Sequence, residues 1–281
     1  MAKLAVIHLV RAANGLAVLQ EFVTSYRLFP AGAEHELVLL CKGFTDERAL
    51  VGHRDLLQGI PHRTLLVADR GLDIGSYREA LQHCDHDLLC FLNSFSRILA
   101  ADWLAKLAAP AQLPEVGLSG ATGSWESLLT SLRALAGDRE RGLLRRSVSL
   151  VRARREARNY QPFPNPHVRT NAFLARRELL LSLRWPTVRS KANALAFESG
   201  VDGLTAQVRR RGLQVLIVGR DGVAQGQEHW PTSRTFRTGN QDNLLVADNQ
   251  TAAWQRAPAA ERQWLARQSW GAADTCQDAG A

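Results

Sequence analysis

The sequence predicts an α/β fold with a mostly parallel central sheet and helices on both of its faces. In the first half, short apolar runs alternate with segments of helical apolar spacing, as LAVIHLV and the following LAVLQEFVTSYRLF illustrate. Near-continuous apolar strands separated by helices are typical of parallel sheets buried on both faces. The chain has 281 residues, 46% of them hydrophobic, which suits one large domain with an extension. No apolar run approaches the roughly 20 residues that span a bilayer.

Each element is predicted from its own pattern. The first strand is expected at 4–10, and a helix at 16–29 follows the Asn14-Gly15 break. The next elements are strands at 36–44, 63–69 and 87–93, and helices at 47–59, ended by Gly59, and at 76–84, capped by Ser76. Downstream we expect a helix capped by Asp102, a strand within 116–125, a basic helix or helix pair within 133–158, an extended Pro-rich link at 161–167, a strand entering a helix at 168–183, a helix at 197–212 and a strand at 213–219.

The pattern divides the chain into two parts. Residues 1–220 form the α/β domain, interrupted at 133–167 by the basic helical insertion and its Pro-rich link. Residues 221–281 form a C-terminal extension: loop to about Asp248, then a helix with Trp254, Trp264 and Trp270, then a polar tail. The amide-rich run at 240–251 either orders a lid or caps turns.

Polar side chains follow the predicted strands at one edge of the sheet. Right-handed crossovers place the carboxyl ends of the strands there, where ligands bind in such folds. The residues expected at this edge are Arg11 and Asn14, Lys42 to Asp46, Asp69 to Asp73, and Asn93 to Ser96. No GxGxxG follows the first strand and no GxxxxGK[ST] occurs, so the sequence gives little support to a dinucleotide site and excludes a P-loop.

The net charge of +8 and the basic isoelectric point come mainly from arginine. A nucleic acid, an anionic membrane surface or a phosphorylated substrate would each explain this charge, as would the codon preference of a GC-rich genome. Nucleic acid is disfavoured because the arginines are not interleaved with stacking aromatics. Nine arginines lie within 133–158, with Leu143, Leu144, Val148 and Val151 at helical spacing among them. This segment is expected to dock on anionic lipid or on an acceptor's phosphate.

The four cysteines are scattered, at Cys41, Cys84, Cys90 and Cys276. They form no CxxC pair and fit no zinc site. Three lie in or beside apolar runs and are expected in the core. This usage favours a reducing compartment, so we expect a cytoplasmic protein, peripheral on the inner face of the plasma membrane.

Several stretches together resemble one enzyme family over roughly residues 4–220. They are the first strand with Asn14, DRGLDIGSYREAL at 69–81, LCFLNSFSRILAADWLAKL at 89–107, PEVGLSGATG at 114–123, and FESGVDGLTAQVRRRGLQV at 197–215. In this order they resemble a GT-A glycosyltransferase of the family-two type that builds bacterial surface polysaccharides. The chain departs from that family at three places: Arg11 stands where Pro is usual, Phe95 where a metal-binding Asp is usual, and Ser199 where a second acid is usual.

The resemblance implies transfer of a sugar from a nucleoside diphosphate to a lipid-linked or polysaccharide acceptor. The diphosphate leaves with negative charge, and a base must take the proton of the attacking hydroxyl. The implied base is Glu198, with Asp202 as second choice, because residues four apart share a helix face. The implied donor-binding residues are Arg11, Asn14, Asp69, Asp73, Asn93, Ser94, Arg97, His229, Arg234 and Arg237, and the implied acceptor-binding residues are Arg169 and Asn171.

The usual metal motif of that family is missing. Asn93, Ser94 and Ser96 are weak neutral ligands, so the motif does not support Mg²⁺ or Mn²⁺ as a cofactor. Three explanations stay open. Cations, namely Arg97, Arg234 and Arg237, replace the metal; or Asp69, Asp73 or His229 holds it; or the chain is a non-catalytic scaffold or regulator of a polysaccharide pathway.

Overall fold

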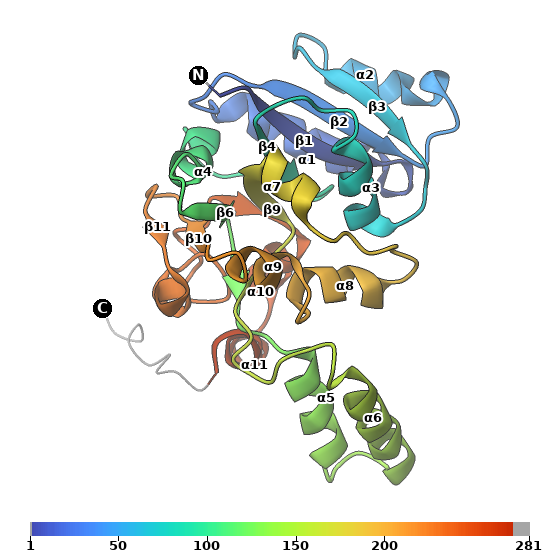
Figure 1. The fold of residues 1–281 in the computed structure, drawn as a ribbon. Coiled ribbons are helices and arrows are strands. Elements are labelled where there is room, and N and C mark those ends of the chain that lie inside the picture. Colours follow the sequence, from blue (N-terminus) through green and yellow to red (C-terminus); the bar gives the residue numbers. More distant parts are fainter. Residues whose placement is uncertain (1, 272–281) are drawn as a thin grey trace.

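The computed structural model describes residues 2–271 and confirms the α/β class (Figure 1). Its centre is an eight-stranded sheet in the order β11-β10-β6-β9-β4-β1-β2-β3, parallel except for β9 and β11. Helices cover both faces of the sheet (Figure 1). The strands are β1 (Leu4–Arg11), β2 (Glu36–Lys42), β3 (Arg63–Val67), β4 (Leu88–Leu92), β6 (Val116–Gly120), β9 (Ala172–Arg176), β10 (Gln214–Val218) and β11 (Ala224–Gln225).

The side-chain alternation of β1 shows how the sheet is buried on both faces. Ala5, Ile7 and Leu9 belong to one apolar cluster, whereas Val6 and Val10 belong to the other. Successive side chains of a strand point to opposite faces, so a continuous apolar run supplies both cores. The covering helices are α1 (Gly15–Leu28), α2 (Val51–Leu56), α3 (Leu72–Ala80), α4 (Trp103–Ala111), α7 (Arg177–Ser182), α8 (Lys191–Ser199) and α9 (Leu204–Arg209).

One expected helix cap is wrong, and another lies at the expected residue without a capping bond from its side chain. Helix α3 begins at Leu72, after Gly71 in the left-handed region (φ 78°), so Ser76 lies inside the helix and its hydroxyl donates to the Leu72 carbonyl. Asp102 does precede α4, but it has a φ of 58° and its side chain makes no capping bond. Its backbone amide donates instead to the Pro30 carbonyl.

The helix expected at 197–212 is two helices. Helix α8 ends at Ser199 and α9 starts at Leu204, with Gly200 and Gly203 between them. A Cβ on Gly203 would lie 2.7 Å from the Phe197 carbonyl oxygen, so this tight turn requires glycine. The break separates the two acids that the sequence placed on one helix face.

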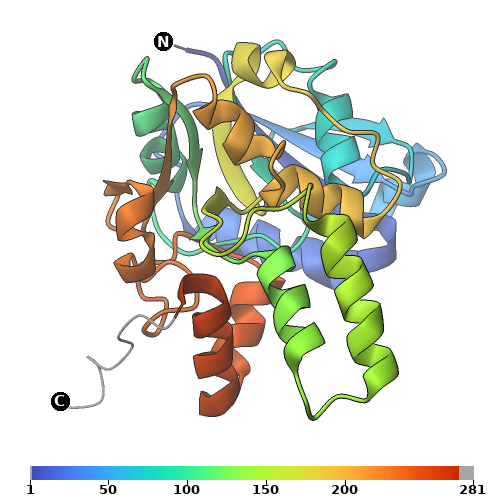
Figure 2. The same ribbon diagram turned by 60° about the horizontal axis from the view of Figure 1, so that its bottom comes forward.

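The basic segment is a helical hairpin, so of the two expected forms, one helix or a helix pair, the structure shows the pair. Helices α5 (Leu128–Gly137) and α6 (Leu143–Glu156) project from the body of the molecule (Figures 1 and 2). They share a small core formed by Leu129, Leu132, Ala153 and Tyr160.

The C-terminal region adds one strand to the central sheet and forms a separate two-stranded sheet with β5. Strand β11 pairs with β10, and β12 (Val246–Ala247) pairs with β5 (Arg97–Ile98). Two helices follow, α10 (Asn249–Arg256) and α11 (Ala259–Trp270), where the sequence predicted one. Cys41, Cys84 and Cys90 are buried as expected, whereas Cys276 and the polar tail lie outside the described residues. No helix within residues 2–271 is long and apolar enough to cross a membrane.

Candidate active site

The carboxyl edge of the sheet holds a cluster of charges, as expected. Arg11 ends β1 and Lys42 ends β2, directly opposite each other in the sheet register. The Asp69 carboxylate, two residues past β3, lies 3.9 Å from the Arg11 guanidinium and 4.0 Å from the Lys42 ammonium. These three residues therefore come from adjacent strands and meet at the edge where ligands of parallel sheets bind.

Lys42 was expected at this edge from the sequence, but no role was assigned to it. It is only 1% exposed, and its ammonium donates to the carbonyls of Arg70 and Leu72, at 2.9 and 2.7 Å. Burial lowers the pKa of Lys42, and the Arg11 charge lowers it further, while Asp69 and Asp73 oppose both effects. Lys42 thus fixes the turn that carries Asp69 and leads into α3.

Asp73, in the first turn of α3, lies between this cluster and α8. Burial raises the pKa of its carboxyl, and the negative charge of Glu198 adds to the rise, while Lys42 and Arg11 oppose it. One turn further along α3 is Tyr77, whose buried hydroxyl has no hydrogen-bond partner among the described residues. A carboxyl whose pKa is raised by burial, next to a cluster of charged side chains at the ligand edge of a sheet, is a candidate for a functional site.

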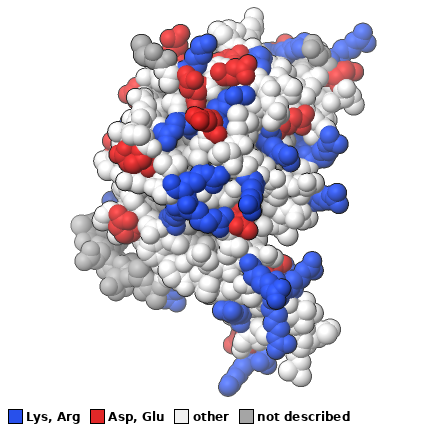
Figure 3. Space-filling model, viewed as in Figure 1, with Lys and Arg blue, Asp and Glu red and all other residues white. Residues whose placement is uncertain are grey.

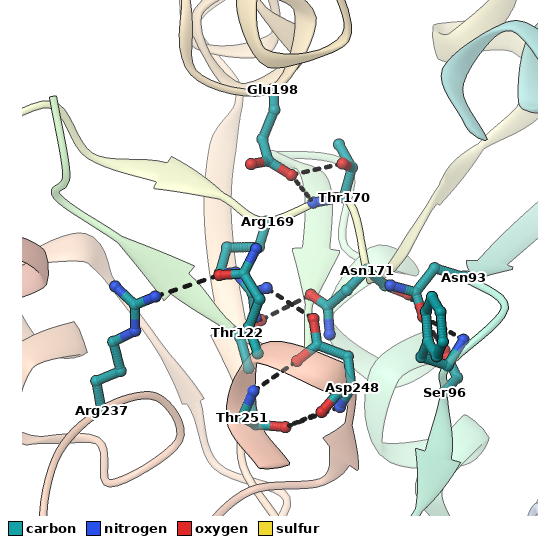
Figure 4. Close-up of polar contacts among 12 residues, drawn as sticks. Asn93, Ser96, Thr122, Arg169, Thr170, Asn171, Glu198, Arg237, Asp248 and Thr251 are labelled. Atoms are coloured by element: carbon teal, nitrogen blue, oxygen red, sulfur yellow. Dashed lines mark hydrogen bonds and ion pairs between the residues drawn. The ribbon is translucent and has the colours of Figure 1, made fainter. Parts of the chain in front are cut away.

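Glu198 is held by one residue from a separate loop. Its Oε2 accepts from the Thr170 amide at 2.7 Å and from the Thr170 hydroxyl at 2.5 Å (Figure 4). Thr170 lies between the predicted acceptor residues Arg169 and Asn171, and no pattern in the sequence pointed to it. Asp202 differs: its carboxylate is 75% exposed and pairs with Arg210 at 2.7 Å. The glycine turn separates the two acids, so they do not share one helix face, and Glu198 stays the first candidate for the base.

The polar side chains of the loop after β4 form hydrogen bonds within the loop. The Asn93 side-chain oxygen accepts from the Phe95 amide at 3.0 Å and from the Ser96 hydroxyl at 3.2 Å. Ser94 is buried, and Phe95 is 39% exposed. This neutral turn does not fit a divalent metal, which prefers several free oxygen ligands.

A metal held elsewhere is not supported either. Across residues 2–271, no group of three or more His, Cys, Asp or Glu side chains could hold a metal ion. His229 belongs to the 3₁₀ helix Gln227–Thr232 beside β10 and β11, whereas Asp69 follows β3 at the opposite end of the sheet. Asp69, Asp73 and His229, each named from the sequence as a possible metal ligand, therefore belong to no such group within the described residues.

The two predicted acceptor residues are largely engaged within the protein. The Arg169 guanidinium pairs with the Asp248 carboxylate at 2.7 Å, with both side chains almost fully buried (Figure 4). Burial alone would raise the pKa of Asp248, but the Arg169 charge and hydrogen bonds from Arg169 and Thr251 lower it overall. The Asn171 side-chain oxygen accepts from Thr122 at 2.8 Å, while its buried nitrogen has no partner in the described part of the chain.

The remaining predicted donor contacts are dispersed. Arg97 faces Glu21 of α1 at 3.8 Å, and Arg234 pairs with Asp242. Arg237 is buried, lies 3.3 Å from Glu126 and stacks on Phe236. His229 is 68% exposed beside Glu228. Asn14, by contrast, lies near the edge at the start of α1, with its side-chain nitrogen buried and unpaired among the described atoms.

A hollow lies at the opposite, amino-terminal edge of the sheet. It has a volume of about 1490 Å³ and is lined by residues that include Lys3, His35, His86 and Arg177. We place the candidate site at the carboxyl edge instead, because that is where adjacent parallel strands deliver Arg11, Lys42 and Asp69 together.

Comparisons with known proteins give structural likeness only. No protein-family model and no curated protein matches the sequence. A mannosyltransferase from Pyrobaculum calidifontis, solved with GDP-Man and Mn²⁺, shares 16% identity at a TM-score of 0.48; the match covers 84% of this chain and 60% of that one. Glucosyl-3-phosphoglycerate synthase from Mycobacterium tuberculosis shares 18% identity at a TM-score of 0.45, over 95% of this chain and 76% of that one. A CMP:2-keto-3-deoxy-manno-octonic acid synthetase shares 12% identity at a TM-score of 0.42, over 77% of this chain and 89% of that one.

Proposed function

We propose that the chain is a glycosyltransferase that moves a sugar from a nucleoside diphosphate to a polysaccharide or lipid-linked acceptor, in bacterial cell-surface glycan synthesis. One observation carries the proposal: cations and carboxylates from β1 and β2 and from the segment after β3 meet at the carboxyl edge. The charge of Glu198, which Thr170 holds in place, contributes to the raised pKa of Asp73 at this edge. It would act at the cytoplasmic face of the membrane, with residues 1–220 as the catalytic domain and 221–281 as an extension.

The proposed roles follow the charges of these side chains. Asp69 and Asp73 accept hydrogen bonds from the nucleoside, and Asn14, Asn93 and Ser94 line the same edge. The acceptor oxygen attacks the anomeric carbon, the bond from that carbon to the phosphate oxygen breaks, and Glu198 takes the hydroxyl proton.

The nucleoside diphosphate leaves with its bonding electrons, and Arg11 stabilises its charge. Of the cations proposed from the sequence, Arg11 is best placed, because it lies at the edge and is partly exposed. Arg97, Arg234 and Arg237 are already paired with acids of the protein, so any share they take in donor binding requires these pairs to rearrange.

The donor site is tested by isothermal titration of UDP, GDP and dTDP in EDTA, and again with Mn²⁺. We expect one nucleotide to bind in EDTA and the Arg11→Gln variant to bind it at least about tenfold more weakly, because a charge-assisted contact is lost. Arg78→Gln, at an exposed position on α3, is the matched control. If none of the three binds under either condition, the donor-site proposal fails, and binding only with Mn²⁺ contradicts the metal-free part.

The alternative is a non-catalytic protein of the same fold that scaffolds or regulates a polysaccharide pathway. Phe95 in the place of a metal ligand is the observation in its favour. A cell that makes normal surface glycan with the Glu198→Gln chain, but not without the chain, would support this alternative.

A further inference from the structure

Helix α6 presents an apolar stripe to solvent. Leu144, Val148 and Val151 recur at four- and three-residue steps, so they share one helix face. They are 80%, 53% and 64% exposed, and the neighbouring Leu143 is 77% exposed. The opposite face is the one that packs on α5, where Ser149 and Ala153 are buried. The hairpin core is thus complete without the stripe, which amounts to an exposed apolar patch of the kind that marks an interaction surface.

Arginines flank this stripe on the same helix. The exposed side chains of Arg145, Arg152, Arg154 and Arg155 surround it. Figure 3 shows Lys and Arg gathered over the hairpin, where acidic side chains are few. A helix with an apolar centre and a cationic rim lies in the interface of an anionic bilayer, with the apolar side chains among the acyl chains and the arginines at the headgroups.

The geometry points to an anionic membrane as the occupant of this face: we propose that Leu143, Leu144, Val148 and Val151 insert into the bilayer surface while the flanking arginines bind lipid phosphates. A second copy of the chain fits less well, because two such faces would bring their cationic rims together. A nucleic acid would leave the apolar centre without a partner.

The hairpin is joined to the candidate site at its base. The Asn159 carbonyl, just after α6, accepts from the Val201 amide in the turn after Glu198. Glu126, just before α5, pairs with Arg237. We expect a hairpin seated on lipid to bring the end of α8, which carries Glu198, toward the membrane, where a lipid-linked acceptor lies. This consequence rests on the proposed function, whereas membrane binding itself does not.

The test is flotation of the full chain with vesicles of phosphatidylcholine alone and of phosphatidylcholine with about one third phosphatidylglycerol. We expect binding to the anionic vesicles only. Replacing the four apolar residues by serine, in L143S/L144S/V148S/V151S, should weaken this binding more than about tenfold. R145Q/R152Q/R154Q/R155Q should weaken it by about fivefold per arginine at low salt. The matched controls L28S/V51S and R78Q/R220Q change exposed residues of the same types outside the hairpin and should bind as the unaltered chain does.

Three outcomes would overturn the proposal. Full binding by the serine variant would show adsorption by charge without insertion. Equal binding to neutral vesicles would remove the role of the arginines. A dimer that the serine substitutions dissociate, with no vesicle binding, would assign the face to a second copy. Thermal melts check that each variant folds, and Glu198→Gln should still bind vesicles, so failure of the transferase proposal is distinguishable from failure of this one.

Discussion

Both hydrogen-bond donors of Thr170, its amide and its hydroxyl, point to the same oxygen of Glu198, at 2.7 and 2.5 Å. The carboxylate lies at the end of α8, and Thr170 lies in the loop before β9, so two separate segments fix its orientation. A general base works only when it is held within hydrogen-bond reach of the proton it takes.

Glu198→Gln should abolish most sugar transfer while leaving nucleotide binding intact. The amide keeps the shape but cannot accept a proton, and loss of a general base costs about 10²- to 10⁴-fold in rate. Single-turnover assays with titration of the nucleotide measure the two effects separately. Glu178→Gln, exposed near the amino-terminal edge, is the matched control. A larger loss of transfer in Asp202→Asn than in Glu198→Gln would contradict the assignment.

Lys42→Met should weaken nucleotide binding by about tenfold, since it removes two hydrogen bonds that hold the turn at residues 70–72. The methionine fills similar space and carries no charge. The free energy of unfolding should therefore change less than it would if a buried charge were left without a partner. Titration calorimetry and denaturant unfolding measure both quantities. Lys106→Met, outside the edge cluster, should bind nucleotide normally. Unchanged affinity in Lys42→Met would mean that the turn does not position the donor contacts.

Asp248→Asn should destabilise the protein by about 3–5 kcal/mol, because it leaves the buried Arg169 charge without its partner. Urea unfolding measures the change. Asp242→Asn breaks the half-exposed pair with Arg234 and should cost about 1 kcal/mol or less. Since the folded-state pKa of Asp248 is lowered, its stabilisation is present above the unfolded pKa near 3.8 and is lost as the pH falls below it. Equal losses of unfolding free energy in the two variants would contradict the larger cost expected for breaking the buried pair.

His8 should make the protein sensitive to mild acid. It is fully buried on β1, stacked 3.7 Å from the Phe22 ring, and burial lowers its pKa to about 3. Below pH 6.5 the His8 side chain is protonated in the unfolded chain but not in the folded chain. Stability therefore falls by about 1.4 kcal/mol per pH unit until the pKa of His8 in the folded chain is reached. His8→Leu should reduce the slope of stability with pH by about 1.4 kcal/mol per unit between pH 6 and 4, whereas His83→Leu, at an exposed position, should leave the slope unchanged. If the free energies of unfolding of His8→Leu and of the original chain fell with pH at the same rate, the effect assigned to the burial of His8 would be contradicted.

The fold class follows from local pattern, and the structure confirms it. Continuous apolar runs such as 36–42 supply both faces of a parallel sheet, and the order of strands and helices places their carboxyl ends together. The antiparallel insertion of β9 between β4 and β6 was not predictable, because strand order depends on which distant edges meet. The broken helix at Gly200 and Gly203 was missed because a spacing of four residues indicates one face only if the helix is continuous.

The sequence by itself determined the α/β class, the edge that carries Arg11 and Asp69, the helical character of the basic segment and the absence of an acid at position 95, because periodicity, turn residues and composition are local properties. Only the tertiary structure decided what Arg169 does. Its carboxylate partner, Asp248, lies 79 residues further along the chain, and nothing in either local sequence specifies the pair. Two charges can be buried only if they meet, so the fold assigned Arg169 to Asp248, while Thr170 beside it holds Glu198.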